Sequence, residues 1–203
     1  MKHFKIGVIV LVALLWAGSA VASVNLVTNG DFEILPSPIS PGGYKIYQEL
    51  EGWKLVTGTG IEVQSGHSSQ SGNPTHYVEL DSYSNSAMKQ RIYNLQSGQT
   101  YTLSFEYFNR TNNPQYTSDI NVKFGNIDYT TAWYNQAWTT LSMTFLYSGS
   151  VMADLIFTAV GSSNSYGGYI DNVSLRTVPV PGAALLLGSA LIGIVGMRKK
   201  FMA

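Results

Sequence analysis

Apolar and polar residues alternate one by one through most of the middle of the chain. In the segment 101–108, YTLSFEYF, every second residue from Tyr101 to Tyr107 is apolar or aromatic, and Thr, Ser and Glu stand between them. The same two-residue period recurs in the segments 88–93, 120–124, 141–145 and 153–158. Successive side chains of a strand point to opposite faces, so each segment predicts a β-strand with one buried and one polar face.

Short clusters of Gly, Asn and Ser separate these segments, and no stretch shows sustained helical periodicity. The clusters lie at 95–98, 109–114, 148–150 and 161–168. This spacing predicts one all-β domain, an antiparallel β-sandwich of the jelly-roll type with about eight to ten strands. A core of roughly 150 residues is large enough to be stable without disulfides, and the chain has no cysteine.

The first 22 residues follow a different pattern. Lys2 and Lys5 precede an apolar run from Ile6 to Trp16, and Ala20-Val21-Ala22 follows as a small-x-small site. This layout predicts a secretory signal peptide, residues 1–22, that directs export by the Sec machinery and is cleaved after Ala22. The alternative is an uncleaved anchor helix, but the run is short and ends in small residues.

The other end of the chain predicts a single transmembrane helix. Residues 182–197 are uncharged and almost wholly apolar, and a run of this length just spans a bilayer. Three cations follow at once: Arg198, Lys199 and Lys200. They would keep the basic end, 198–203, on the cytoplasmic side of the membrane. The alternative is a buried C-terminal helix of the domain, which the cations argue against.

The tail 178–203 resembles a PEP-CTERM sorting signal. A Pro-x-Pro motif (178–181, with Pro179, Val180 and Pro181) precedes the apolar span and the basic end, in the order of that family. The commonest form has Glu between the prolines, where this chain has Val180. In that family an exosortase, a membrane protease-transpeptidase, recognises and processes the tail. The resemblance implies a Gram-negative source that makes exopolysaccharide, and a protein destined for the cell surface or extracellular matrix, membrane-anchored before processing.

Separating the ends from the domain changes the meaning of the net charge. The whole chain balances 12 basic against 12 acidic residues. The predicted mature domain, 23–177, holds seven of the basic and all twelve of the acidic residues, a net charge of −5. This composition excludes nucleic acid as a partner, because a polyanion needs a basic surface. It also makes an acidic polysaccharide a poor direct ligand unless calcium bridges the two.

Both edges of the domain carry motifs of a known fold. Residues 25–33 read NLVTNGDFE and residues 166–175 read YGGYIDNVSL. These motifs resemble the first and last strands of galactose-binding-like jelly rolls, which include several families of carbohydrate-binding modules. The resemblance spans the mature domain and implies its fold, whereas a function depends on the site that the fold carries.

The same resemblance implies a structural calcium ion. In those modules the Glu of the first motif and the Asp of the last bind one Ca²⁺, and the matching residues are Glu33 and Asp171. If the first and last strands lie side by side, the two carboxylates meet, and Ca²⁺ accepts about six to eight oxygens. Asp31 and the carbonyl of Asn29 are further candidate ligands. In the alternative, Asn29 and Asp31 serve only the turn, and the two carboxylates bond backbone amides.

A sugar-binding surface is the second candidate. Sugars stack on aromatic rings, while their hydroxyls need polar partners. Residues of both kinds on polar strand faces and loops are the candidate ligand-binding residues: Arg91, Tyr93, Glu106, Arg110, Trp133 and Tyr134. Scattered tyrosines are also ordinary in a β-sandwich, and Trp53 and Trp138 are predicted to lie in the core. The domain's two histidines, His67 and His76, lie near Gly- and Ser-rich sequence.

No sequence motif indicates catalysis. The chain lacks Gly-x-Ser-x-Gly, His-Glu-x-x-His and a phosphate-binding glycine loop. Glu79 and Asp81 share one strand face, which predicts a solvated or structural role. The sequence therefore predicts an exported, non-catalytic protein that binds carbohydrate, such as the cell's own exopolysaccharide. The alternatives are a purely structural matrix protein without a sugar site and a glycan-active enzyme, whose paired carboxylates are defined only in space.

Overall fold

Twelve β-strands make up the regular structure of the described residues in a computed structural model of the chain. The structure describes residues 23–66, 75–111, 118–131 and 136–179, and Val24–Thr177 forms one unit. The strands are β1 (Tyr44–Tyr47), β2 (Glu49–Leu50), β3 (Trp53–Thr57), β4 (Ile61–Ser65), β5 (His76–Glu79), β6 (Ala87–Tyr93), β7 (Thr100–Phe108), β8 (Ile120–Phe124), β9 (Ile127–Thr130), β10 (Thr139–Leu146), β11 (Met152–Ala159) and β12 (Tyr169–Thr177).

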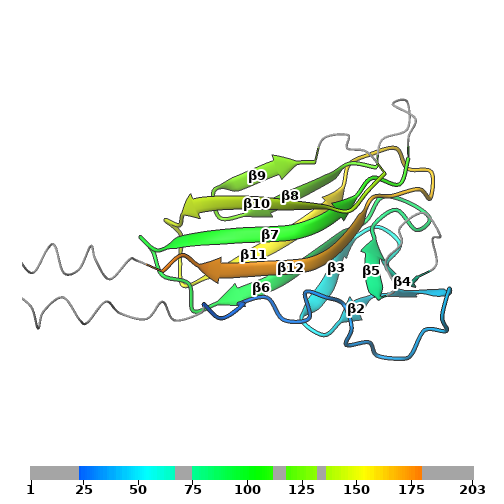
Figure 1. The fold of residues 1–203 in the computed structure, drawn as a ribbon, viewed down its shortest axis with the longest axis horizontal. Coiled ribbons are helices and arrows are strands. Elements are labelled where there is room, and N and C mark those ends of the chain that lie inside the picture. Colours follow the sequence, from blue (N-terminus) through cyan, green and yellow to red (C-terminus); the bar gives the residue numbers. More distant parts are fainter. Residues whose placement is uncertain (1–22, 67–74, 112–117, 132–135, 180–203) are drawn as a thin grey trace, which may run out of the picture. The chain divides into compact units, whose positions relative to one another are not determined.

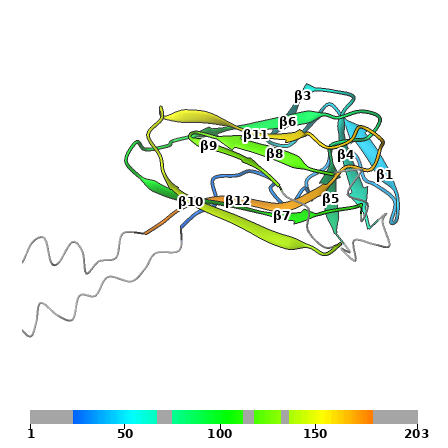
Figure 2. The same ribbon diagram turned by 90° about the horizontal axis from the view of Figure 1, so that it is seen from above.

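The strands form two six-stranded sheets that lie face to face (Figures 1 and 2). Sheet A has the order β1-β4-β5-β12-β7-β10, and sheet B has the order β2-β3-β6-β11-β8-β9. All the strand pairs in the two sheets are antiparallel. The predicted all-β antiparallel sandwich is confirmed for the described part of the chain.

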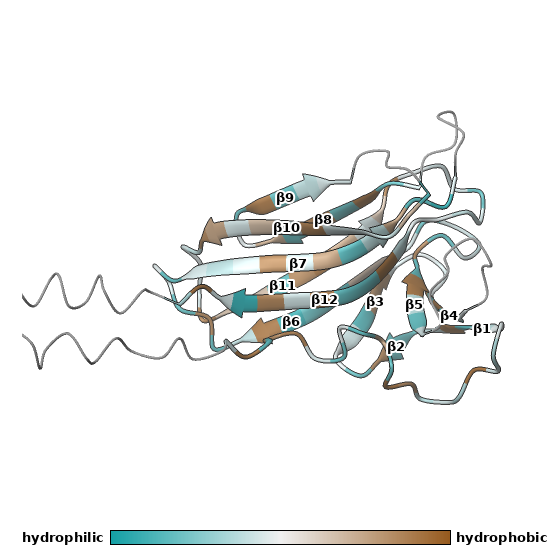
Figure 3. Ribbon diagram, in the orientation of Figure 1, coloured by the Kyte–Doolittle hydropathy of each residue, from teal (hydrophilic) through white to brown (hydrophobic). Residues whose placement is uncertain are grey.

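The core lies between the sheets, on the faces that the sequence alternation predicts. On β7, Tyr101, Leu103, Phe105 and Tyr107 are all buried in it. Figure 3 shows the corresponding succession of apolar and polar bands along the central strands. Trp53 is also in this core, as predicted, and its ring centroid lies 5.9 Å from that of Phe157.

One core-facing residue of β6, Gln90, is polar and binds the N-terminal segment. Gln90 lies between the inward-facing Met88 and Ile92 and is buried. Its side-chain oxygen accepts a hydrogen bond from the Thr28 amide at 2.7 Å, and its nitrogen donates to the Thr28 carbonyl at 2.8 Å. A buried amide whose two ends are both bonded is not a defect, and this one ties the N-terminal segment to sheet B.

The N-terminal segment also lies beside the last strand, as the two edge motifs predict. The amide of Leu26 donates to the carbonyl of Leu175 at 2.9 Å, and the amide of Val173 donates to the carbonyl of Gly30 at 2.8 Å. A Cβ atom on Gly30 would collide with the carbonyl oxygen of Val173. Glycine at this position therefore permits the close approach of the two backbones.

The number of strands exceeds the prediction of about eight to ten. The missed strands include β1 and β2, which follow a stretch rich in Pro and Gly. β1 pairs only with β4 and β2 only with β3, so both are edge strands. An edge strand is held by the backbone pairing of one neighbour and need not show a strict apolar alternation.

No helix in the described ranges is long and apolar enough to cross a membrane. The predicted signal peptide (1–22) and membrane span (182–197) lie outside those ranges, as do Val180, Pro181, Arg198, Lys199 and Lys200. Both targeting segments, the sorting motif and the domain boundaries therefore stay predictions.

Candidate functional site

Acidic, amide and aromatic side chains gather on the outward face of sheet A. On β4 and β5, Ile61, Val63 and Val78 turn into the core, so the alternation sends the residues between them outward. The antiparallel register then places Glu62 directly opposite Glu79. Carboxylates at opposed positions repel each other, so this pair needs compensating partners.

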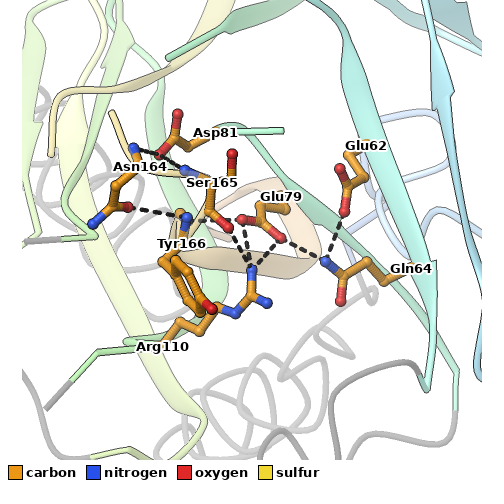
Figure 4. Close-up of polar contacts among 9 residues, drawn as sticks. Glu62, Gln64, Glu79, Asp81, Arg110, Asn164, Ser165 and Tyr166 are labelled. Atoms are coloured by element: carbon orange, nitrogen blue, oxygen red, sulfur yellow. Dashed lines mark hydrogen bonds and ion pairs between the residues drawn. The ribbon is translucent and has the colours of Figure 1, made fainter. Parts of the chain in front are cut away.

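Gln64 and Arg110 supply those partners (Figure 4). The Gln64 Nε2 atom donates to Glu62 Oε1 at 2.9 Å and to Glu79 Oε2 at 2.5 Å. The Arg110 Nη1 atom lies 2.8 Å from each Glu79 oxygen, and the Gly167 amide donates to Glu79 Oε1 at 2.8 Å. We call Glu62, Gln64, Glu79, Arg110 and Tyr166 the A-face site.

Both carboxyl groups of the A-face site are buried, and the Arg110 guanidinium pairs with that of Glu79. Burial raises the pKa of Glu79 to about 8, with a further contribution from Glu62, although Arg110 acts in the opposite direction. A strongly shifted carboxyl of this kind is typical of functional sites, although structural networks produce it too.

Gln64 has an unused acceptor. Its side chain is 1% exposed, and its Oε1 atom has no hydrogen-bond partner among the described residues. A buried polar atom without a partner costs about 1–3 kcal/mol. The Oε1 atom can therefore accept one more hydrogen bond than the described residues supply.

Aromatic rings surround the polar groups. Tyr77, Phe108 and Tyr169 form a second buried cluster against which Trp138 packs, with 4.7 Å between the ring centroids of Tyr77 and Tyr169. Trp138 is thus partly buried on the outward face of sheet A, and its predicted place in the sandwich core is wrong. Periodicity could not predict this position, because Trp138 precedes β10 and takes no part in its alternation.

Tyr166 offers the open ring of the site. The Arg110 guanidinium carbon lies 4.6 Å from the centroid of the Tyr166 ring, within the range of a cation–π contact. Tyr166 remains 56% exposed. The guanidinium thus fixes one face of the ring and leaves the side chain open to solvent.

Glu79 and Asp81 hold the loop that carries Tyr166. Asp81 Oδ2 accepts hydrogen bonds from the amides of Asn164 at 2.7 Å and Ser165 at 2.9 Å, while Glu79 accepts from Gly167. Both carboxylates are buried. Of the predicted roles, the structural one is confirmed and the solvated one is wrong, because the loop 160–168 covers the strand end.

The structure divides the sequence-predicted sugar ligands between the two sheets. Arg110 belongs to the A-face site, and Glu106 lies on β7 of the same sheet, where it accepts a hydrogen bond from Asn172 Nδ2 at 3.0 Å. Arg91 and Tyr93 lie on β6, in sheet B. Trp133, Tyr134 and His67 lie outside the described residues.

Sequence reasoning did not single out three members of the A-face site: Glu62, Gln64 and Tyr166. The signal for two of them is the segment 61–65, IEVQS, where an acid and an amide alternate with Ile and Val. Tyr166 gave no such signal, because its position depends on the loop contacts of Asp81 and Glu79.

Asn29 and Asp31, two of the candidate calcium ligands, lie in one turn of the N-terminal segment. Asn29 Oδ1 accepts from the Ile34 amide at 2.9 Å, and its Nδ2 donates to the Ile34 carbonyl at 3.0 Å. The Asn29 carbonyl accepts from the Trp53 ring nitrogen at 3.1 Å. Asp31 is exposed in the same turn.

The two carboxylates of the predicted calcium site bond nearby nitrogens. Glu33 accepts from the His76 amide at 2.8 Å and lies 2.7 Å from His76 Nδ1. Asp171 Oδ1 accepts from the Asn172 amide at 2.6 Å. Within the described ranges, no three His, Asp or Glu side chains form a group that could hold a metal ion. These contacts are those of the alternative without a metal, and calcium stays a prediction.

Several solved structures are similar to this one at low sequence identity. An arabinose-bound MgGH51 α-L-arabinofuranosidase is 14% identical, with a TM-score of 0.51 over 79% of this chain and 27% of that chain. The enzymatically active domain of bacteriophage CBA120 tailspike protein 4 is 17% identical, with a TM-score of 0.49 over 76% of this chain and 22% of that chain. The module TmCBM61 in complex with β-1,4-galactotriose is 16% identical, with a TM-score of 0.42 over 77% of this chain and all of that chain.

These likenesses concern the fold. This chain spans about a quarter of the length of the first two proteins. No curated protein matches it. The sequence of residues 25–176 matches the model of a family described as protein of unknown function (DUF642), and the chain therefore belongs to the DUF642 family.

Proposed function

We propose that the protein is an exported, non-catalytic carbohydrate-binding protein of the cell surface or matrix, and that the A-face site receives the sugar. One observation carries the proposal: the unpartnered Oε1 of buried Gln64 and the open ring of Tyr166 both belong to the Arg110–Glu79 network.

This combination fits the surface of a sugar. A pyranose or furanose ring has hydroxyls that donate to carbonyl or carboxylate oxygens, and C–H groups that pack on an aromatic face. Gln64 and Glu62 supply oxygens, and Tyr166 supplies a face. Because the hydrogen bonds of the network hold these groups in place, little side-chain entropy is lost on binding.

Recognition suits the A-face site better than catalysis. Both oxygens of Glu79 accept short hydrogen bonds from Arg110, Gln64 or Gly167. A general acid or base needs an oxygen that reaches the substrate, whereas a residue that orients other groups does not. We assign Glu79 to the positioning of Arg110 and Gln64.

The proposed location depends on the sequence alone. The signal peptide would direct export through Sec, and the tail 178–203 would bring the protein to an exosortase and hold it in the membrane before processing. Detection of the mature chain in the matrix fraction, with a mass that shows loss of both ends, tests this part.

A purely structural matrix role is the second candidate. The contacts of Asp81 and Glu79 with the loop 160–168 favour it, because they explain the buried carboxylates without a ligand. Under this alternative, no sugar binds at the A-face site.

Calorimetry of the full chain with a panel of neutral oligosaccharides separates the two candidates. We expect binding, and we expect Tyr166→Ala to weaken it about tenfold by removing the ring. Leu146→Ala is the control, because Leu146 lies at the end of β10, outside the A-face site, and is 61% exposed, close to the 56% of Tyr166. Absence of binding to every neutral oligosaccharide, or equal losses for both variants, would refute the assignment.

A further inference from the structure

A concave surface lies on sheet B, away from the A-face site. Its lining comes from the N-terminal segment, the turn before β3 and the strand β6, and it encloses about 690 Å³. Three of its lining side chains are cationic, Lys54, Lys89 and Arg91, and a fourth is Tyr93. We call these four residues and the space between them the basic groove.

The cations of the basic groove lie close enough together to repel one another. The register of β3 and β6 puts Lys54 directly opposite Lys89, a pairing of like charges that destabilises a sheet. Arg91 follows two residues later on β6, so its side chain points to the same outward face. The strands therefore concentrate three of the domain's seven cations at one place.

One carboxylate serves two of these cations. Asp154 Oδ1 lies 2.7 Å from Arg91 Nε, and its Oδ2 lies 3.1 Å from Arg91 Nη2 and 2.9 Å from Lys89 Nζ. Hydrogen bonds from Arg91 and then Lys89 lower the pKa of Asp154 to about 2, so it stays ionised. Its single negative charge leaves one positive charge in excess.

Lys54 adds a further positive charge. Its nearest carboxylate partner is Glu49, at 3.6 Å, and both side chains are largely exposed. A surface pair of this kind is weak. Glu51 is the one acidic residue that lines the groove, against three cations. Asp154, Glu49 and Glu51 thus match the three cations in number, but the side chains of Lys54 and Arg91 stay 73% and 50% exposed and can reach an anion in the groove.

Tyr93 adds an aromatic face to this charge. It is 57% exposed and lies two residues from Arg91 on the outward face of β6. We propose that the basic groove binds a uronate unit of an acidic polysaccharide, with the sugar ring packed on Tyr93 and its carboxylate near Lys54, Lys89 and Arg91. This inference is independent of the A-face site.

Methyl esterification of the ligand tests the proposal. We expect the full chain to bind an oligomannuronate in calorimetry at low salt, and to bind the same oligomer at least about tenfold more weakly when its carboxylates are methyl esters. The affinity for the free acid should also fall as salt rises. Equal affinity for acid and ester would overturn the proposal.

Two variants with opposite expected effects test the residues. Lys54→Gln should weaken oligomannuronate binding about two- to fivefold, while Asp154→Asn should strengthen it, because Lys89 and Arg91 lose their internal counter-charge. Lys123→Gln is the matched control, since Lys123 lies on β8 of the same sheet, outside the groove, and contacts Asp128 at 3.2 Å. Losses of the same size for Lys54→Gln and Lys123→Gln would refute the groove.

Two further measurements separate this proposal from others. Tyr166→Ala should leave oligomannuronate binding unchanged, so the A-face site and the basic groove can fail independently. A single-stranded oligonucleotide should bind much more weakly than the oligomannuronate. If the oligonucleotide binds as tightly, the groove selects negative charge alone and the assignment to a sugar is wrong.

Discussion

Glu79 is the residue whose ionisation is most strongly opposed by its surroundings. It is 1% exposed and lies opposite Glu62. Burial and this neighbour raise its pKa from 4.5 to about 8 in spite of Arg110. The folded protein therefore binds a proton that the unfolded chain releases, and this difference acts between pH 4.5 and about 8.

This proton uptake makes the folded state less stable as pH rises. As pH rises through this window, the contribution of Glu79 to the free energy of unfolding falls, by up to about 5 kcal/mol. Glu79→Gln mimics the protonated form, so the variant should lose less stability than the wild type between pH 5 and pH 8. Chemical denaturation at both pH values measures the two slopes.

The exposed Glu49 provides the control for this experiment. Glu49→Gln should keep the wild-type dependence of stability on pH. Parallel slopes for wild type and Glu79→Gln would show that the Glu79 carboxyl ionises normally in the folded protein.

The role of Glu79 could not be predicted from the sequence, because it depends on a distant loop. Alternation places Glu79 and Asp81 on one strand face, and this part of the prediction is correct. Whether that face meets water depends on the loop 160–168, which lies far away in the chain. Loop contacts of this kind leave no periodic signal.

At the scale of elements, the N-terminal segment makes its main contacts with two strands far along the chain. Gln90 of β6 binds Thr28, and Leu175 and Val173 of β12 bind the backbone of the segment. The segment is not a regular strand, and it is held by these hydrogen bonds, by close packing at Gly30 and by the burial of Val27 and Phe32 in the core.

Gly30→Ala tests this packing. The new methyl group would collide with the Val173 carbonyl, and we expect the free energy of unfolding to fall by about 1–3 kcal/mol. Val24→Ala, in the same segment at an exposed position, should change it little. An unchanged stability for Gly30→Ala would mean that the segment is not packed closely against β12.

The strands themselves were the most predictable elements. In β6, β7, β8 and β11 the two-residue period predicts the buried face correctly, because one face of each strand packs in the core and the other points outward. The edge strands β1 and β2 lacked the signal. The A-face site was only partly predictable, since Arg110 was identified but the register that opposes Glu62 and Glu79 was not.

At the scale of the whole molecule, a bound calcium ion is predicted to add to the free energy of unfolding. Of the residues of the predicted site, Glu33, Asp171 and Asn29 bond nearby groups of the protein, while Asp31 is exposed, and binding an ion would have to replace some of these contacts. Any ligand that binds only the folded state stabilises it by mass action.

Calcium at about 100 times its dissociation constant should therefore raise the Tm by roughly 5–10 °C, and EDTA should reverse the rise. Glu33→Gln should abolish this response, because it removes the negative charge and keeps an acceptor for the His76 amide. An identical melt in calcium and EDTA would exclude the site.

The average charge of the domain is a poor guide to its surface. The value of −5 argued against an acidic ligand, yet the register of β3 and β6 gathers cations in one groove, while the register of β4 and β5 sets the acidic residues Glu62 and Glu79 opposite each other on the other sheet. Net charge determines long-range attraction, whereas a bound group senses the side chains within a few ångströms.

The sandwich has one more consequence, because its two sheets turn their outer faces in opposite directions (Figure 2). Packed sheets are only about 10 Å apart. With a neutral sugar held on sheet A and an acidic sugar on sheet B, one molecule would tie two unlike polymers together at nearly fixed separation. Many such molecules would act as crosslinks, and a solution of mixed polysaccharides would then stiffen into a gel.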